Sequence, residues 1–269
     1  MNLMSDVPID GVPVHERRSD RRRSMTLKPF NDVVVCVPCY NEAERLNFYV
    51  FEKFLHKYKD IHLVFVNDGS TDETPQILSD FTSKFRRQTH FLNLETNVGK
   101  AEAVRQGIQY CLELDRALIG YWDADLATDL SAIPDFARIL REKPHVDVVM
   151  GARLKLMGHE VNREFKRLLV SKICNVLAKA ALRQNFRDTQ CGAKLIRRSD
   201  ALEAVLKEPF ETPWLFDVEL FKRLKREKKS RDFFYEYPLS RWEEIEGSKI
   251  KLRTIVKSAI SMLKLIISR

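Results

Sequence analysis

Short apolar runs and longer amphipathic segments alternate along the first half of the chain. The apolar runs, each suited to a single strand, lie at 33–37, 62–66, 90–94, 117–122 and 146–150. In the intervals, apolar residues recur at helical spacing near 42–57, 72–87, 99–114 and 131–141. This alternation predicts β/α units, and therefore an α/β fold with a mostly parallel sheet flanked by helices.

The second half predicts two amphipathic helices, at about 162–183 and 250–267, with apolar residues along one side and Lys or Arg around them. Shorter elements are predicted between them: a strand at 193–197, a helix at 215–226 and a strand at 233–238. An amphipathic basic helix favours the membrane interface over a spanning position. Packing against the domain or against a partner subunit is the alternative for each helix.

The pattern divides the chain into three parts. Residues 1–30 have little apolar periodicity and carry five arginines between positions 17 and 23, which predicts a disordered basic arm. Residues 31–248 are expected to form the folded domain, and residues 249–269 a basic amphipathic helix.

Charge and composition indicate where such a domain works. The net charge is +8, and residues 249–269 contain no acid. An anionic membrane surface or a phosphorylated acceptor suits this charge better than nucleic acid, for which no recognition signature is present.

No apolar stretch reaches the ~20 residues that span a bilayer, no signal-peptide core is visible, and five scattered cysteines favour reduced thiols. We therefore expect a cytoplasmic protein, peripheral on the cytosolic face of a membrane. The oligomeric state stays open, and a homo-oligomer is one arrangement the sequence allows.

Polar clusters follow four of the predicted strands. They are Pro38-Cys39-Tyr40-Asn41-Glu42, Asn67-Asp68-Gly69-Ser70, Asn97-Val98-Gly99-Lys100 and Asp123-Ala124-Asp125. In a doubly wound sheet these strand ends meet at one rim, where ligands bind. Asn41-x-x-Glu44 and Ser70-x-x-Glu73 also have the spacing of capping boxes, so we expect phosphate-favouring helix N-termini beside this rim. Turn chemistry accounts for any one cluster, but less readily for all four in order.

Asp123-Ala124-Asp125 is the cluster with the clearest metal chemistry. Two carboxylates one residue apart, at the end of a buried strand, form an oxygen-rich corner. Such a corner suits a hard divalent cation that carries a diphosphate. A turn followed by a helix is the alternative for the triplet taken alone.

These clusters resemble those of the family 2 glycosyltransferases of the GT-A fold, a Rossmann-like arrangement. The resemblance rests on VPCYNEAERL, VNDGSTDET, NVGKAEAVRQGI and DADL, within residues 33–130. In the second half RDTQCGAKL, WLFDVEL and RWEEIEGSKI look like the dolichyl-phosphate or polyprenyl-phosphate β-glucosyltransferase branch.

The resemblance implies roles for individual residues. A UDP-sugar pocket would take in Pro38, Tyr40, Asn41, Glu42, Asp68, Lys100 and Ala124. Asp123 would face the nucleotide-sugar and Asp125 would hold Mg²⁺ or Mn²⁺, with Asp123 as the second metal residue. The mannosyl relatives within the family often have a glutamine where this chain has Ala127, so a third side-chain metal ligand is missing there.

Five further positions carry the chemistry of transfer by the same resemblance. Arg153 matches a diphosphate contact, and Arg167 and Ser171 match a pair that holds an acceptor phosphate. Lys249 fits a mobile loop that closes over the phosphates, and Asp217 is the candidate base. Because a monoalkyl phosphate is largely ionised at neutral pH, Asp217 would more plausibly position a phosphate acceptor than deprotonate it.

The first hypothesis is a metal-dependent inverting transferase that moves glucose from UDP-glucose to dolichyl or polyprenyl phosphate. A transferase that glycosylates a hydroxyl of a polysaccharide or glycolipid is the alternative among enzymes. A non-catalytic membrane-binding scaffold with the same fold is the alternative outside them.

Overall fold

A seven-stranded sheet forms the centre of the computed structural model, which describes residues 30–154, 156–161, 175–229 and 232–243. In spatial order the strands are β3 (Thr89–Leu94), β2 (His62–Asp68), β1 (Val33–Cys39), β4 (Leu118–Trp122), β7 (Ala193–Arg197), β5 (Val148–Ala152) and β8 (Phe234–Pro238). Only β7 runs antiparallel to its neighbours within this sheet. The predicted mostly parallel α/β sheet is confirmed.

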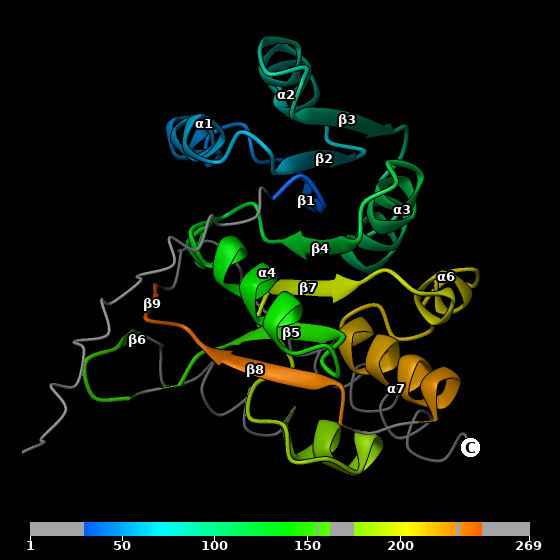
Figure 1. Ribbon diagram of the computed structural model, residues 1–269. Helices are drawn as coiled ribbons and strands as arrows, with labels where there is room; N and C mark the ends of the chain where they lie inside the picture. The colour runs from blue at the N-terminus through cyan, green and yellow to red at the C-terminus, as the bar shows by residue number, and fades with distance from the viewer. Residues whose placement is uncertain (1–29, 155, 162–174, 230–231, 244–269) are drawn as a thin grey trace, which may run out of the picture.

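Helices cover both faces of the sheet. They are α1 (Phe48–Lys57), α2 (Thr74–Lys84), α3 (Lys100–Glu113), α4 (Ala132–Glu142), α6 (Asp200–Val205) and α7 (Phe216–Lys228). Figure 1 shows α3, α6 and α7 along one side of the stacked strands and α1 on the other. Along β1, Val34 and Cys36 belong to the core beneath α3, α6 and α7, whereas Val33 and Val35 belong to the core beneath α1, α2 and α4. Because both faces are buried, the strands read as continuous apolar runs in the sequence.

The strand order reverses between β1 and β4. The chain passes from β1 outward to β2 and β3, and then returns through α3 to place β4 on the other side of β1. A crevice opens at the carboxyl ends of two strands whose connections leave in opposite directions. The fold therefore places the ends of β1 and β4 at the expected ligand site.

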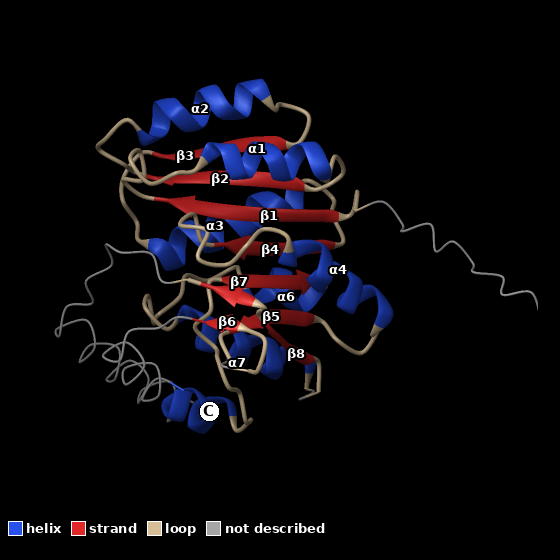
Figure 2. Cartoon of the chain, turned by 90° about the vertical axis from the view of Figure 1, so that its left-hand side faces the viewer, coloured by secondary structure: helices blue, strands red, loops and turns tan. Residues whose placement is uncertain are grey.

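A small appendage extends from the same rim. Strands β6 (Glu160–Val161) and β9 (Arg241–Trp242) pair in parallel, beyond the ends of β5 and β8 (Figure 2). Residues 175–182 are helical, in agreement with the end of the helix predicted at 162–183. Most of that helix, residues 1–29 of the predicted arm and the helix predicted at 249–269 lie outside the described residues. Within the described parts of the chain, no helix is long and apolar enough to cross a membrane.

The two predicted capping boxes are wrong. Helix α1 begins at Phe48, not near residue 42, and Asn47 caps it by accepting a hydrogen bond from the Val50 amide. Helix α2 begins at Thr74 without a side-chain cap from Glu73. Asn41 has a φ of 51°, in the left-handed region, and its amide donates to Ser70 Oγ at 3.0 Å. The polar residues of both motifs therefore join two loops instead of starting helices.

Candidate active site

A pocket of about 430 Å³ lies at the crevice between β1 and β4. Its lining consists of Pro38, Cys39, Tyr40, Glu42, Arg45, Asp68, Asn97, Gly99, Lys100, Asp123, Ala124 and Asp125. All four polar clusters of the sequence contribute, so the structure brings together what the strand pattern predicts. Of the residues predicted to bind the nucleotide-sugar, Asn41 and Arg153 are outside this lining.

Asn41 instead holds the walls of the pocket together. Its Oδ1 accepts a hydrogen bond from the Thr71 amide at 2.9 Å, while Thr74 Oγ1 accepts one from the Glu42 amide at 2.8 Å. These bonds tie the loop after β1 to the loop after β2. Asn41 thus stabilises the two loops that line the pocket.

Asp68 at the end of β2 anchors the segment that leads into α3. Its carboxylate accepts hydrogen bonds from the amides of Val98 at 2.8 Å and Gly99 at 3.1 Å. Burial raises the pKa of Asp68, and these two amide donors oppose the rise. The following residue, Gly69, has a φ of +60°, and a Cβ there would lie 2.2 Å from the Asn97 amide nitrogen. Only glycine lets the two loops approach this closely, and their contact sets the position of Lys100.

Lys100 reaches from the first residue of α3 to the carboxylates at the end of β4. Its Nζ lies 2.6 Å from Asp123 Oδ1. Desolvation alone would lower the pKa of Lys100, but the charge of Asp123, helped by Asp125 and the deeper Asp217, raises it. Lys100 therefore stays a cation at the centre of the pocket.

Asp123 is placed by the strand beside it. The Asp123 amide donates to the Gly192 carbonyl at 2.8 Å, which extends the pairing of β4 with β7 by one residue. A Cβ on Gly192 would come within 1.9 Å of Asp123 Oδ2. The carboxylate of Asp123 thus lies directly against Gly192. Any larger residue at position 192 would displace this carboxylate.

Asp125 ends the β4 turn. Its Oδ1 accepts a hydrogen bond from the Ala127 amide at 3.0 Å. Burial and the neighbouring charge of Asp123 raise its pKa, against the opposing effect of Lys100 and Arg45. Two adjacent carboxylates that repel each other, held by one lysine, form a site that a divalent cation would stabilise.

The carboxylates fit Mg²⁺ or Mn²⁺ only as a partial ligand set. Among the described residues, no group of three His, Cys, Asp or Glu side chains is arranged around a common metal position. Asp123 and Asp125 can offer hard oxygen ligands, and the remaining positions would fall to water and to phosphate oxygens of a bound donor. This is the usual division for Mg²⁺, which retains several waters and is held through substrate phosphates.

Arg45 is a pocket residue that the sequence reasoning missed. Its Nη2 lies 2.6 Å from Glu42 Oε1, and its side chain is half exposed. The other oxygen, Glu42 Oε2, is buried and has no hydrogen-bond partner within the described structure. Burial raises the pKa of Glu42, and Arg45 opposes the rise. The signal was present as the Glu-x-x-Arg spacing within NEAER, but its contact with the pocket depends on the loop between β1 and α1.

Arg153 lies at the rim but outside the pocket lining. Its Nε donates to Asp188 Oδ2 at 2.6 Å and its Nη2 to Asp188 Oδ1 at 2.8 Å, and its guanidinium lies 5.1 Å from the Trp242 ring centroid. Burial would lower its pKa, but the Asp188 carboxylate more than compensates and raises it. A diphosphate contact by Arg153 stays a prediction, and the ion pair with Asp188 uses two of the five guanidinium N–H donors.

Asp217 is also outside the pocket lining. Its side chain is 6% exposed and lies 3.1 Å from Lys194 Nζ. The proposed acceptor residues Arg167, Ser171 and Lys249 lie outside the described residues, so their roles stay predictions.

The fold and the site together define a glycosyltransferase. Residues 34–203, more than half of the chain, match the profile of Glycosyl transferase family 2, and the chain belongs to this family. The chain is similar in structure to glucosyl-3-phosphoglycerate synthase from Mycobacterium tuberculosis, crystallised with Mn²⁺, UDP-glucose and phosphoglyceric acid. The TM-score is 0.62, with 15% identity, and the match covers 87% of this chain and 79% of that one. This likeness supports the GT-A fold.

Its relatives in sequence point to one branch of the family. The chain is 31% identical to a dolichyl-phosphate β-glucosyltransferase of Trichomonas vaginalis, over 88% of this chain and 74% of the relative. The dolichyl-phosphate β-glucosyltransferases of Dictyostelium discoideum and Homo sapiens are 30% and 29% identical, and the chain covers 68% and 70% of their lengths. The predicted family membership is confirmed.

Proposed function

We propose that this protein transfers glucose from UDP-glucose to dolichyl or polyprenyl phosphate, with Mg²⁺ or Mn²⁺, at the cytosolic face of a membrane. The main support is the pocket at the β1–β4 crevice, in which Lys100 pairs with Asp123, and Asp125 lies beside them. The named activity of its relatives supports both the glucosyl group and the lipid-phosphate acceptor.

The donor would lie across the pocket from Tyr40 to Asp125. Tyr40 lines the pocket and is 45% exposed, so its ring is available to stack on a nucleobase. At the other end, Asp123 and Asp125 would hold the divalent cation. When bound, that cation supplies Lewis-acid stabilisation of the departing diphosphate.

Lys100 would change partners when the donor binds. In the free protein its ammonium neutralises Asp123. A cation shared by Asp123 and Asp125 would take over that neutralisation and release Lys100 toward the phosphates, where preorganised positive charge stabilises the leaving group.

The acceptor decides whether a proton must be removed. A monoalkyl phosphate has a second pKa near 6 and is largely a dianion at neutral pH. It can attack the sugar without a general base, whereas a hydroxyl, with a far higher pKa, needs one. Arg167, Ser171 and Lys249 are the residues we propose for holding this phosphate. A phosphate acceptor also agrees with the buried position of Asp217.

Incubation of the full chain with radiolabelled UDP-glucose and dolichyl phosphate tests the proposal. We expect label in the organic phase with Mn²⁺ or Mg²⁺, and loss of this product in EDTA with recovery when the metal is restored. Labelled product only in the aqueous phase or on a polysaccharide would favour the hydroxyl-acceptor alternative. No product with any acceptor would favour the non-catalytic scaffold.

A further inference from the structure

A closed network of polar side chains lies in the core directly behind the pocket. Lys194 of β7 has a fully buried side chain, and its Nζ lies 3.1 Å from Asp217 Oδ1 of α7. The same Nζ donates to Tyr121 Oη of β4 at 3.0 Å, and Tyr121 Oη donates in turn to Asp217 Oδ1. Each of the three side chains therefore contacts the other two.

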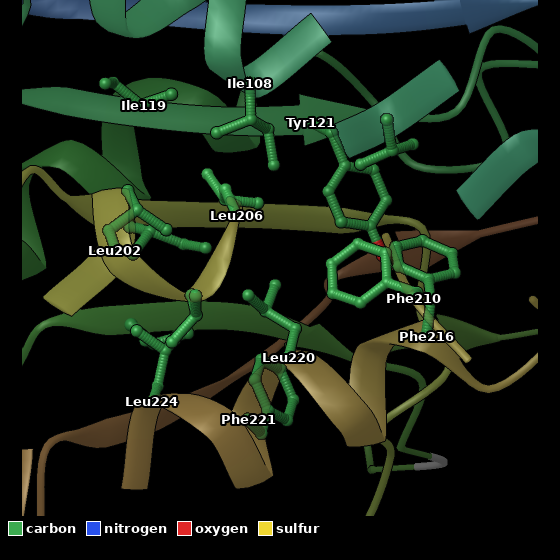
Figure 3. Close-up of a cluster of buried hydrophobic side chains, with 14 of the residues drawn as sticks. Ile108, Ile119, Tyr121, Leu202, Leu206, Phe210, Phe216, Leu220, Phe221 and Leu224 are labelled. Atoms are coloured by element: carbon green, nitrogen blue, oxygen red, sulfur yellow. The ribbon is translucent and has the colours of Figure 1, made fainter. Parts of the chain in front are cut away.

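One oxygen of the Asp217 carboxylate already has two buried partners. Its Oδ1 already accepts a hydrogen bond from the tyrosine and carries the ion pair with Lys194. Burial raises the pKa of Asp217, and Lys194 followed by Tyr121 opposes the rise. The aromatic ring of Phe216 packs against Tyr121, Phe210 packs against Phe216, and both rings belong to the buried cluster around the network (Figure 3). A carboxylate so enclosed differs from a base that must reach a substrate.

The network is connected to Asp123 through two short paths. Tyr121 is two residues before Asp123 on β4, and it pairs across the sheet with Lys194. Lys194 Nζ also donates to the Cys191 carbonyl at 2.5 Å. The next residue, Gly192, accepts the Asp123 amide and lies against the Asp123 carboxylate.

The Lys194 ammonium and the Asp217 carboxylate neutralise each other, so removal of either one alone is expected to destabilise the protein strongly. A fully buried ammonium and a buried carboxylate stabilise each other, and removal of one leaves the other uncompensated. Removal of both, by side chains of similar shape, leaves no stranded charge. A double substitution therefore separates loss of the network's geometry from loss of a reacting group.

We propose that Lys194, Asp217 and Tyr121 form a buried positioning network that fixes the end of β4 and the Cys191-Gly192 turn, and so the Asp123 carboxylate. Asp217 acts through Lys194 and Tyr121 and takes no proton from the acceptor. The inference rests on the proposed role of Asp123 in holding the donor.

The test compares Lys194→Met, Asp217→Asn and the double variant with the unsubstituted protein. Calorimetry with UDP and MnCl₂ measures donor-site affinity, thermal unfolding measures stability, and the pH profile of kcat/KM measures proton transfer. We expect each single variant to lower Tm by roughly 10 °C and to weaken UDP–Mn²⁺ binding by about tenfold. In the double variant we expect affinity within about threefold of the original, measurable transfer, and an unchanged acidic limb of the pH profile, which is the limb that a general base would set.

Glu219→Gln is the matched control. Glu219 lies on the same helix, is buried, and pairs with Arg223 at 2.5 Å, away from the network. We expect it to lower Tm without changing UDP–Mn²⁺ affinity.

Three results would overturn the network. One is a Lys194→Met variant with lowered Tm but unchanged affinity. Another is a double variant as inactive as Asp217→Asn alone, which would restore Asp217 as a base. The third is a double variant that retains activity but whose acidic limb shifts. Absence of UDP–Mn²⁺ binding by the unsubstituted protein would instead refute the proposed function.

Discussion

The carboxylates of the pocket and those of the interior behind it are the same chemical group in two settings. In the pocket, Asp123 and Asp125 share one lysine between them, and that lysine is half exposed. Asp188 and Asp217, in contrast, are buried, and each is paired with a cation of its own, the partly buried Arg153 and the fully buried Lys194.

This difference in burial distinguishes acids that a ligand can reach from acids that stabilise the fold. An acid with an exposed, shared cation can exchange that cation for a metal ion at little cost, because water covers the intermediate arrangement. An acid with a buried, private cation cannot exchange it without stranding a charge in the core. Acids of the first kind are therefore available to a ligand, and acids of the second kind hold the frame.

The largest effect is expected at the metal corner. Asp125→Asn keeps an oxygen that can accept the Ala127 amide but removes the negative charge. We expect the rate of glucose transfer at saturating UDP-glucose and Mn²⁺ to fall by roughly 10²- to 10³-fold. Asp129→Asn, at an exposed turn acid nearby whose Oδ1 accepts the Ser131 amide, is the control and should keep its activity. A loss below tenfold at Asp125 would contradict the metal assignment.

Next in size is the loss of an interior pair. Asp188→Asn leaves the Arg153 guanidinium, whose side chain is 13% exposed, without its counter-charge. We expect the free energy of unfolding to fall by about 3 kcal/mol in urea titrations. Glu52→Gln, which breaks the exposed pair with Lys84, should leave the free energy of unfolding nearly unchanged. Equal losses of unfolding free energy for Asp188→Asn and Glu52→Gln would contradict the distinction between buried and exposed ion pairs.

A smaller effect is expected at Lys100. Lys100→Met removes a cation from the pocket without disturbing the core, since the side chain is 50% exposed. We expect the Kd for UDP-glucose, measured by calorimetry with Mn²⁺, to rise about tenfold, and Lys100→Arg to recover part of the loss. Unchanged affinity for UDP-glucose in Lys100→Met would mean that Lys100 neutralises Asp123 but does not contact the donor.

The smallest effect is expected at the amino end of β2, away from the pocket. There His62 accepts a hydrogen bond from Arg116 Nη2 at 2.9 Å and lies 3.3 Å from His90. Burial, followed by the charges of Arg116 and His90, lowers the pKa of His62 from 6.5 to about 4. Because the lowered pKa favours the neutral ring, its contribution is complete above pH 6.5 and is lost as the pH falls toward 4.

Urea unfolding at pH 7.5 and pH 5 measures this contribution. We expect His62→Gln to reduce the loss of stability between the two pH values by about 1 kcal/mol, allowing for the partial exposure of the ring. A pH dependence identical to that of the unsubstituted protein would show that the pKa of His62 does not differ between the folded and unfolded states.

Local pattern was enough to predict the sheet and the pocket. Both faces of the sheet are covered by helices, so the strands appear as apolar runs, and polar clusters mark where they end. The same reasoning failed at Asn41 and Ser70, where the spacing of a capping box matched but the side chains bond across two loops. It also missed Arg45, because no pattern specifies how a loop folds back over a pocket.

The sequence by itself determined the order of strands and helices, the four clusters at the strand ends and the family to which the chain belongs. Only the tertiary structure decided which acids remain available. Asp123 and Asp217 cannot be distinguished as carboxylates in a sequence, since burial and the distance to a cation arise from packing between β4, β7 and α7. Asp123 and Asp125 are open to a ligand because they line the pocket, whereas Asp217 is enclosed with Lys194 in the core.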